Sequence, residues 1–114
     1  MNKKSIPEDI KKQANEIVQQ FNEQIINKPN RHYLTRYKGS NLFLDFNDYG
    51  MIGPICRLKY NGGIDDWEFA IYKYSRNQYD PDEWMFPGGE YIDGTIEGAM
   101  KAGIKAYIAD LNIT

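Results

Sequence analysis

Basic and aromatic side chains occur in three stretches of the chain that have the two-residue period of β-strands. If those strands pair, four cations and two tyrosines share one face of the sheet: Arg36, Lys38, Arg57, Lys59, Tyr72 and Tyr74. Cations neutralise phosphate groups, and aromatic rings stack on unpaired bases. The pattern therefore predicts a binding face for single-stranded nucleic acid. The alternative is that these long side chains only cover a half-exposed sheet.

A second cluster, between residues 79 and 91, combines four carboxylates with three large aromatic residues, Trp84, Phe86 and Tyr91. Its acids do not follow the twelve-residue pattern of a calcium-binding EF-hand, so no metal site is predicted there. Large rings in a loop must be buried, either against their own domain or against a partner. The second hypothesis is thus protein interaction or homodimerisation through this loop. The alternative is a loop that folds over one end of the core.

Catalytic signatures are absent from the sequence. Cys56 and His32 are the only cysteine and histidine, and Cys56 falls on the apolar face of a predicted strand, where a thiol is usually inert. Residues 89–95 have part of the spacing of a phosphate-binding loop, but the lysine is missing and Asp93 would repel phosphate. We therefore expect a non-enzymatic binding module that uses no cofactor and no metal.

The composition is that of one globular domain spanning residues 1–114, with 41% hydrophobic and 14% aromatic residues. No apolar run has the length of a membrane span, and no signal peptide is recognisable, so we expect a cytoplasmic protein without a membrane partner. The net charge is −2, which is not typical of a nucleic-acid-binding protein. The charge is unevenly divided, however, because residues 28–60 carry +4 and residues 61–114 carry −6.

Two helices are predicted to flank the strands. Apolar residues spaced by three and four indicate a helix over residues 5–27, with Ser5 and Glu8 as its capping pair. A second helix is predicted over residues 94–110, with Asp93 or Thr95 as its cap. Small residues at every fourth position of that helix, from Gly98 on, predict close packing against the sheet or the first helix.

Between the helices, turn residues separate four predicted strands, at residues 31–38, 41–47, 52–60 and 67–74. Residues 75–93 are predicted to form a structured loop because prolines and glycines interrupt them. The predicted fold is α+β, in the order α-β-β-β-β-α. Both helices are expected on one face of a curled four-stranded antiparallel sheet.

Alternation assigns side chains to the two faces of this sheet. Tyrosines and Thr35 of the first strand are expected inside, and Phe43 and Asp45 of the second outside. In the third strand the inward set is Ile52, Cys56, Leu58 and Tyr60. The core is expected to be anchored by Phe21, Leu44, Leu58, Trp67, Phe69 and Ile71.

Several short motifs lie between residues 55 and 103: ICRLKY, WEFAIYKY, WMFPG and DGTIEGAM. This stretch resembles a family of small bacterial proteins of unknown function, a resemblance that implies no activity and transfers no functional residue. At the level of architecture, a curled basic sheet backed by helices is similar to single-strand-binding transcription cofactors of the Whirly kind. No sequence motif carries that second similarity.

Overall fold

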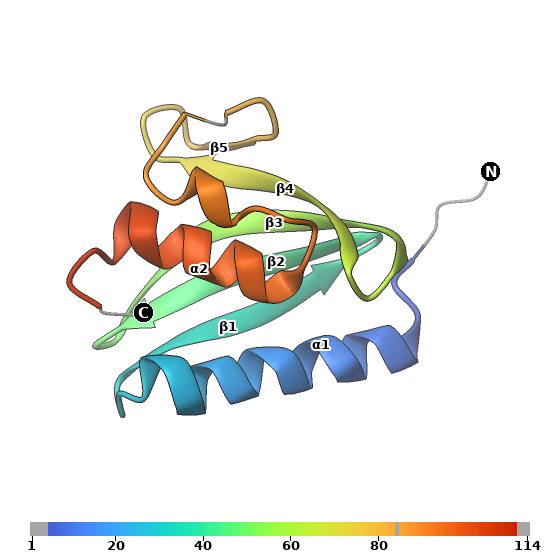
Figure 1. Cartoon of the computed structure of the whole chain (residues 1–114), viewed down its shortest axis with the longest axis horizontal. Helices are drawn as coiled ribbons and strands as arrows, with labels where there is room; N and C mark the ends of the chain where they lie inside the picture. The colour runs from blue at the N-terminus through green and yellow to red at the C-terminus, as the bar shows by residue number, and fades with distance from the viewer. Residues whose placement is uncertain (1–4, 84, 112–114) are drawn as a thin grey trace.

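The computed structural model describes residues 5–83 and 85–111 and has an α+β fold, as predicted (Figure 1). One antiparallel sheet has the strand order β1-β2-β3-β4-β5. In chain order the elements are α1 (Glu8–Phe21), the π-helical turn η1 (Asn22–Ile26), β1 (Arg31–Lys38), β2 (Asn41–Asp48), β3 (Met51–Gly63), β4 (Asp66–Lys73), β5 (Gln78–Asp80), the 3₁₀ turn η2 (Gly89–Tyr91) and α2 (Ile96–Tyr107).

The fifth strand corrects the prediction of four strands and of a loop throughout residues 75–93. β5 pairs with the end of β4 through Ile71↔Asp80, Tyr72↔Tyr79 and Lys73↔Gln78. Three residues are too few for alternation to become visible in a sequence, and the neighbouring turn residues hide them.

The start of α1 also differs from the prediction. The helix begins at Glu8 and has Pro7 as its N-cap residue, with no side-chain cap. Ser5 therefore does not cap it. The backbone carbonyl of Pro7 instead accepts hydrogen bonds from the amides of Ile10 and Lys11. Proline fits this position because its missing N–H would have had no helical partner.

The start of α2 agrees with the sequence. Thr95 is its N-cap, and the Thr95 hydroxyl accepts a hydrogen bond from the amide of Gly98 at 2.9 Å. The small-residue stripe faces a different neighbour from the expected one, because Gly98 lies against the Tyr91 carbonyl and Asp93 in the preceding segment. The close approach to the sheet is made by Gly103, which lies against Tyr33 and Ile55.

A β-bulge in β3 overturns the expected position of Ile52. Leu44 pairs with Cys56 and the next residue, Asp45, with Pro54, so Ile55 is an extra residue in β3. Both Ile55 and Cys56 are consequently buried. The extra residue reverses the alternation nearer the β2–β3 turn, and Ile52 is 61% exposed instead of inside.

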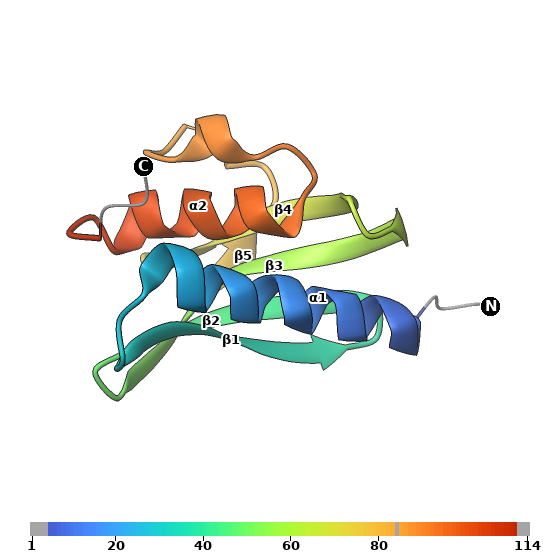
Figure 2. The same ribbon diagram turned by 60° about the horizontal axis from the view of Figure 1, so that its bottom comes forward.

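Figures 1 and 2 show α1 and α2 side by side over the same face of the sheet. Tyr33 of β1 contacts both: its ring meets the Phe21 ring of α1 at 6.1 Å, and its hydroxyl donates to the Met100 carbonyl of α2 at 2.7 Å. The predicted anchors are all buried: Phe21, Leu44, Leu58, Trp67, Phe69 and Ile71. In the described residues no helix is long and apolar enough to cross a membrane.

Candidate nucleic-acid interface

The sheet face opposite the helices, called the outer face below, brings the four predicted cations together in two adjacent rows. One row runs across β1 to β3 as Arg36, Phe43 and Arg57. The next row contains Lys38 and Lys59, on either side of Asn41. Both lysines are exposed. Residues separated by up to 23 positions in the chain therefore form one basic surface because of the strand register.

Arg36 is held in place by an acid on the neighbouring strand. Its Nε and Nη2 donate to the two carboxylate oxygens of Asp45 at 2.5 and 3.0 Å. Its guanidinium also lies 4.7 Å from the centre of the Phe43 ring. The Asp45 hydrogen bond raises the pKa of Arg36 above its already high usual value. Arg36 is thus charged and oriented, but Asp45 balances its charge.

Arg57 has a different environment. Its guanidinium lies 5.7 Å from the centre of the Tyr79 ring, a cation-π contact. Its Nε is buried and has no hydrogen-bond acceptor in the described part of the chain. A buried donor without an acceptor is uncommon in folded proteins and calls for an explanation. Arg57 therefore presents a charge that the described residues do not balance by an ion pair.

Aromatic rings form a continuous cluster beside the two arginines. Tyr79 contacts Phe43 at 5.3 Å and Tyr72 at 4.9 Å, and Tyr72 contacts Tyr74 at 4.9 Å between ring centres. Partial burial raises the pKa of Tyr79 and of Tyr74, so both hydroxyls stay protonated at neutral pH. Tyr79 was not predicted to lie on this face. The sequence pattern assigned it to a loop, because the short strand β5 was not predicted.

Tyr74 also reaches the end of the sheet. Its hydroxyl donates to the Pro54 carbonyl at 2.7 Å, and its ring lies 5.4 Å from the Tyr107 ring of α2. The Tyr107 hydroxyl in turn donates to the Tyr72 carbonyl. Of the two predicted tyrosines, Tyr72 therefore belongs wholly to the outer-face cluster, and Tyr74 links that cluster to the end of the molecule.

The loop of the second hypothesis folds along α2. Phe86 stacks on Phe69 of the core with ring centres 6.1 Å apart, and Tyr91 also packs against the core. Trp84 lies outside the described residues. Met85 is 90% exposed. The rings of Phe86 and Tyr91 thus contact their own domain, and Met85 is the large apolar side chain that the described part of the loop exposes.

Cys56 and His32 do not meet. Cys56 is fully buried on the helix side of the sheet, and burial raises the pKa of its thiol well above the usual value. His32 precedes inward-facing Tyr33 on β1 and so points to the outer face. The two side chains lie on opposite faces and cannot act as a nucleophile and a base.

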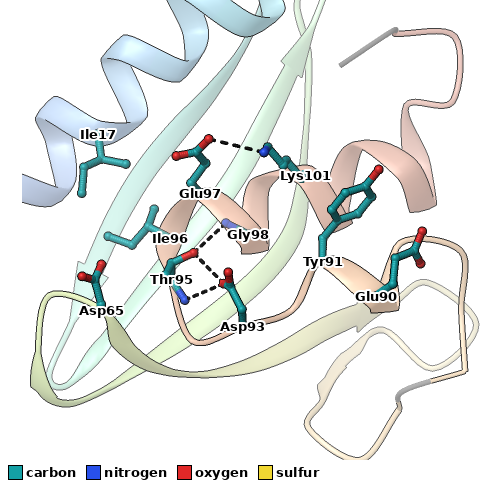
Figure 3. A pocket seen from close by; sticks show the side chains of 10 residues that line it. All are labelled: Ile17, Asp65, Glu90, Tyr91, Asp93, Thr95, Ile96, Glu97, Gly98 and Lys101. Carbon is teal, nitrogen blue, oxygen red and sulfur yellow. Dashed lines mark hydrogen bonds and ion pairs between the residues drawn. The ribbon is translucent and has the colours of Figure 1, made fainter. Parts of the chain in front are cut away.

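A cavity of about 450 Å³ lies at the N-terminus of α2 (Figure 3). Four carboxylates line it: Asp65, Glu90, Asp93 and Glu97. Asp93 accepts hydrogen bonds from the Thr95 amide and hydroxyl at 3.0 and 2.6 Å. The Thr95 hydrogen bonds lower the Asp93 pKa, which keeps the carboxylate charged. Lys101 also lines the cavity and pairs with Glu97, but carboxylates outnumber it, which disfavours a phosphate group there.

Within residues 5–83 and 85–111, no group of three or more histidine, cysteine, aspartate or glutamate side chains is placed to hold a metal ion. No protein-family model matches the chain, and no curated protein or solved structure matches it significantly. The candidate function is therefore argued from the geometry of the outer face.

Proposed function

We propose that this protein is a non-enzymatic binding module that holds single-stranded nucleic acid on the outer face of its sheet. Arg57 is the observation that carries the proposal, because its guanidinium lies against a supporting aromatic ring and has no ion-pair partner among the described residues. A phosphate oxygen is the acceptor that suits a guanidinium best. Lys59, two residues further along β3, and Lys38, in the same row, supply further phosphate contacts.

The aromatic cluster favours a single strand over a duplex. Phe43, Tyr72 and Tyr79 offer ring surface next to the cations, and stacking needs bases whose faces are free. A duplex keeps its bases stacked on each other, and a broad sheet does not enter its grooves. The ligand class that matches both features is an unpaired strand whose backbone follows the Lys38, Arg57 and Lys59 side chains.

The overall charge of −2 does not oppose this proposal, since the charge that matters is local. Residues 28–60, which contain β1, β2 and most of β3, carry +4. This net charge already includes Asp45, which forms an ion pair with Arg36. The remaining cations predict modest affinity with a clear dependence on salt.

Titration of a fluorescent oligothymidylate of about 15 nucleotides tests the proposal, at about 25 and 200 mM salt. Binding should weaken steeply with salt, and a duplex of the same length should bind less well. Arg57→Ala and Lys59→Ala should each reduce affinity about tenfold and lower the salt slope by about one. Lys12→Ala is the matched control, because Lys12 is an exposed lysine of α1 on the opposite side of the molecule.

Two outcomes would contradict the proposal. One is the absence of binding at low salt by the wild-type protein. The other is an equal effect of Arg57→Ala, Lys59→Ala and Lys12→Ala, which would mean that the outer face contributes only general charge.

Capture of a protein partner by residues 79–91 is the second candidate. The observation that favours it is Met85, the most exposed of the large apolar side chains. This candidate requires that Trp84→Ala and Met85→Ala release a co-purifying protein. Retention of that protein by both variants would exclude it.

A further inference from the structure

Exposed apolar side chains gather at one end of the molecule. Among residues 5–83 and 85–111, six large hydrophobic side chains are exposed, and five of them surround the β2–β3 turn and the C-terminal end of α2: Tyr49, Met51, Ile52, Tyr74 and Tyr107. We call these five residues the end-face patch. Both views place the β2–β3 turn and this end of α2 at the same end of the fold (Figures 1 and 2).

The end-face patch contains both projecting side chains and a cavity. Met51 and Ile52 are 77% and 61% exposed. They form one wall of a cavity of about 340 Å³, whose other apolar lining residues include Phe46, Ile55, Tyr74 and Tyr107. A projecting apolar residue and an apolar cavity side by side form a surface that can fit a copy of itself.

The cavity exists because two strands separate at this end. The last residue pair between β3 and β4 toward this end is Cys56↔Ile71, so residues 51–55 of β3 have no β4 partner. Tyr74 partly fills the gap: its hydroxyl bonds to the Pro54 carbonyl and lies close to Gly53. The bulge at Ile55 turns Ile52 outward at the same place. The exposed patch is therefore a product of the strand geometry.

The size of the patch fits an interface. The five side chains expose roughly 600 Å², if a full side chain of this size presents about 200 Å². The largest apolar patch of a typical monomer is a few hundred Å², and a standard interface buries about 800 Å² per partner. Two such patches in contact would lie at the lower end of specific interfaces, which predicts a weak dimer.

The charged side chains around the end-face patch do not oppose the association of two copies of it. Arg31 pairs with Asp48 at 2.7 Å and with Asp110 at 2.8 Å, and its guanidinium lies over the Tyr49 ring. Lys28 is near enough to Asp110 to contribute to the lowering of its pKa. These four charges compensate one another, so two copies meet without net repulsion. A strongly charged partner would find no complementary charge here.

We infer that the end-face patch is the interface of a two-fold symmetric homodimer, in which Met51 and Ile52 of each copy fill the apolar cavity beside Tyr74 and Tyr107 of the other. This interface is distinct from residues 79–91 and does not depend on nucleic-acid binding.

Sedimentation velocity between about 5 and 500 µM tests the inference, a range that covers weak dimers. The wild-type protein should shift from monomer to dimer over this range. Met51→Glu and Ile52→Glu should each weaken the dimer at least about tenfold, because two carboxylates would be buried at one interface. Met85→Glu is the variant that discriminates this patch from residues 79–91, since Met85 is another exposed methionine and lies outside the patch. Unchanged thermal unfolding of the variants verifies that they fold.

Amide chemical shifts on dilution locate the surface independently. Changes should concentrate in residues 49–55 and around residue 107. A wild type that is monomeric at every concentration would overturn the inference. So would a dimer that survives both Met51→Glu and Ile52→Glu, or one that only Met85→Glu dissociates, which would assign the contact to the loop.

Discussion

Arg36 and Arg57 lie on either side of Phe43 in one row of the sheet, yet their partners give them different roles. Arg36 is paired with Asp45, whereas Arg57 has an aromatic contact and no ion pair in the described residues. At the scale of single residues, the partner decides whether a cation is available to a ligand. Asp45 holds Arg36, whereas Arg57 is the cation on which the proposed phosphate contact depends.

Asp45→Asn tests this distinction. The substitution removes the negative charge but keeps the shape of the side chain, so the net charge of the outer face rises by one. We expect affinity for an oligothymidylate to increase several-fold and its salt dependence to steepen. Loss of the partly exposed ion pair should lower the free energy of unfolding by about 1 kcal/mol. Titration and urea unfolding measure the two effects, and an affinity equal to or below that of the wild type would contradict the expectation.

Residue types identified the basic and aromatic face, but not the contacts within it. Alternation placed Tyr33 inside and Phe43 and Asp45 outside correctly, because β1 and β2 pair without interruption from Lys38↔Asn41 to Arg31↔Asp48. The Arg36–Asp45 pair is a diagonal contact between two strands. Such a contact depends on strand register, which a single sequence does not determine at this precision.

At the scale of elements, the bulge in β3 and the short strand β5 explain most of what the sequence could not predict. A single extra residue, Ile55, moves Ile52 from the core to the surface and leaves both Ile55 and Cys56 buried. β5 brings Tyr79 into the aromatic cluster. The hydrophobic periods of α1, α2 and the longer strands were visible because each repeats several times, whereas these two features occur once.

The contact between α2 and the sheet depends on Gly103. A methyl group there would lie 2.6 Å from the Tyr33 hydroxyl and closer still to Ile55. Gly103→Ala should therefore push α2 from the sheet and lower the free energy of unfolding by about 1 to 3 kcal/mol, although alanine favours helix formation. Gly63→Ala is a suitable control, because its methyl group would meet only Asp66 at an ordinary 3.8 Å. If Gly103→Ala is more stable than wild type in urea, the side chains of Tyr33 and Ile55 can move to make room for the methyl group.

The Asp93–Thr95 hydrogen bonds at the start of α2 should make the free energy of unfolding depend on pH in the acidic range. Hydrogen bonds from Thr95 lower the Asp93 pKa, so the unfolded chain binds this proton at a higher pH than the folded protein does. The stabilisation is complete above an unfolded pKa of about 4 and is lost as pH falls through the lower folded value. Asp93→Asn should be less stable than wild type at pH of about 6, and the difference should shrink toward pH of about 2. Thermal unfolding across this range measures it, and a constant difference would contradict the assignment.

At the scale of the whole molecule, the fold separates three kinds of surface. The helices lie on one side of the sheet (Figure 2), the side chains of the basic aromatic face lie on the other, and the apolar end-face patch lies at one end. Tyr74 contacts both Tyr72 of the outer face and Tyr107 of the patch. A dimer formed through the patch would therefore place two outer faces near each other without covering Lys38 or Lys59.

Arg31 joins distant parts of the chain at that end. Its side chain is only 7% exposed and donates to Asp48 at the end of β2 and to both carboxylate oxygens of Asp110, 79 residues away. Arg31 is thus the described side chain that ties the segment after α2 to the sheet by charge. Its hydrogen bonds lower the Asp110 pKa, which keeps the connection ionised over the neutral range.

Arg31→Ala should release the segment after α2 and remove the packing of the guanidinium on Tyr49. We expect the free energy of unfolding to fall by about 1 to 2 kcal/mol, since the partner acids are partly exposed and solvent screens the pairs. Amide hydrogen exchange should accelerate most at residues 108–111, before any change in β2 and β3. Asp110→Asn should reproduce the faster exchange of this segment with a smaller loss of stability, because the Arg31–Asp48 pair remains. Equal protection of residues 108–111 in Arg31→Ala and wild type would show that packing of Ile108 and Leu111 alone holds the segment.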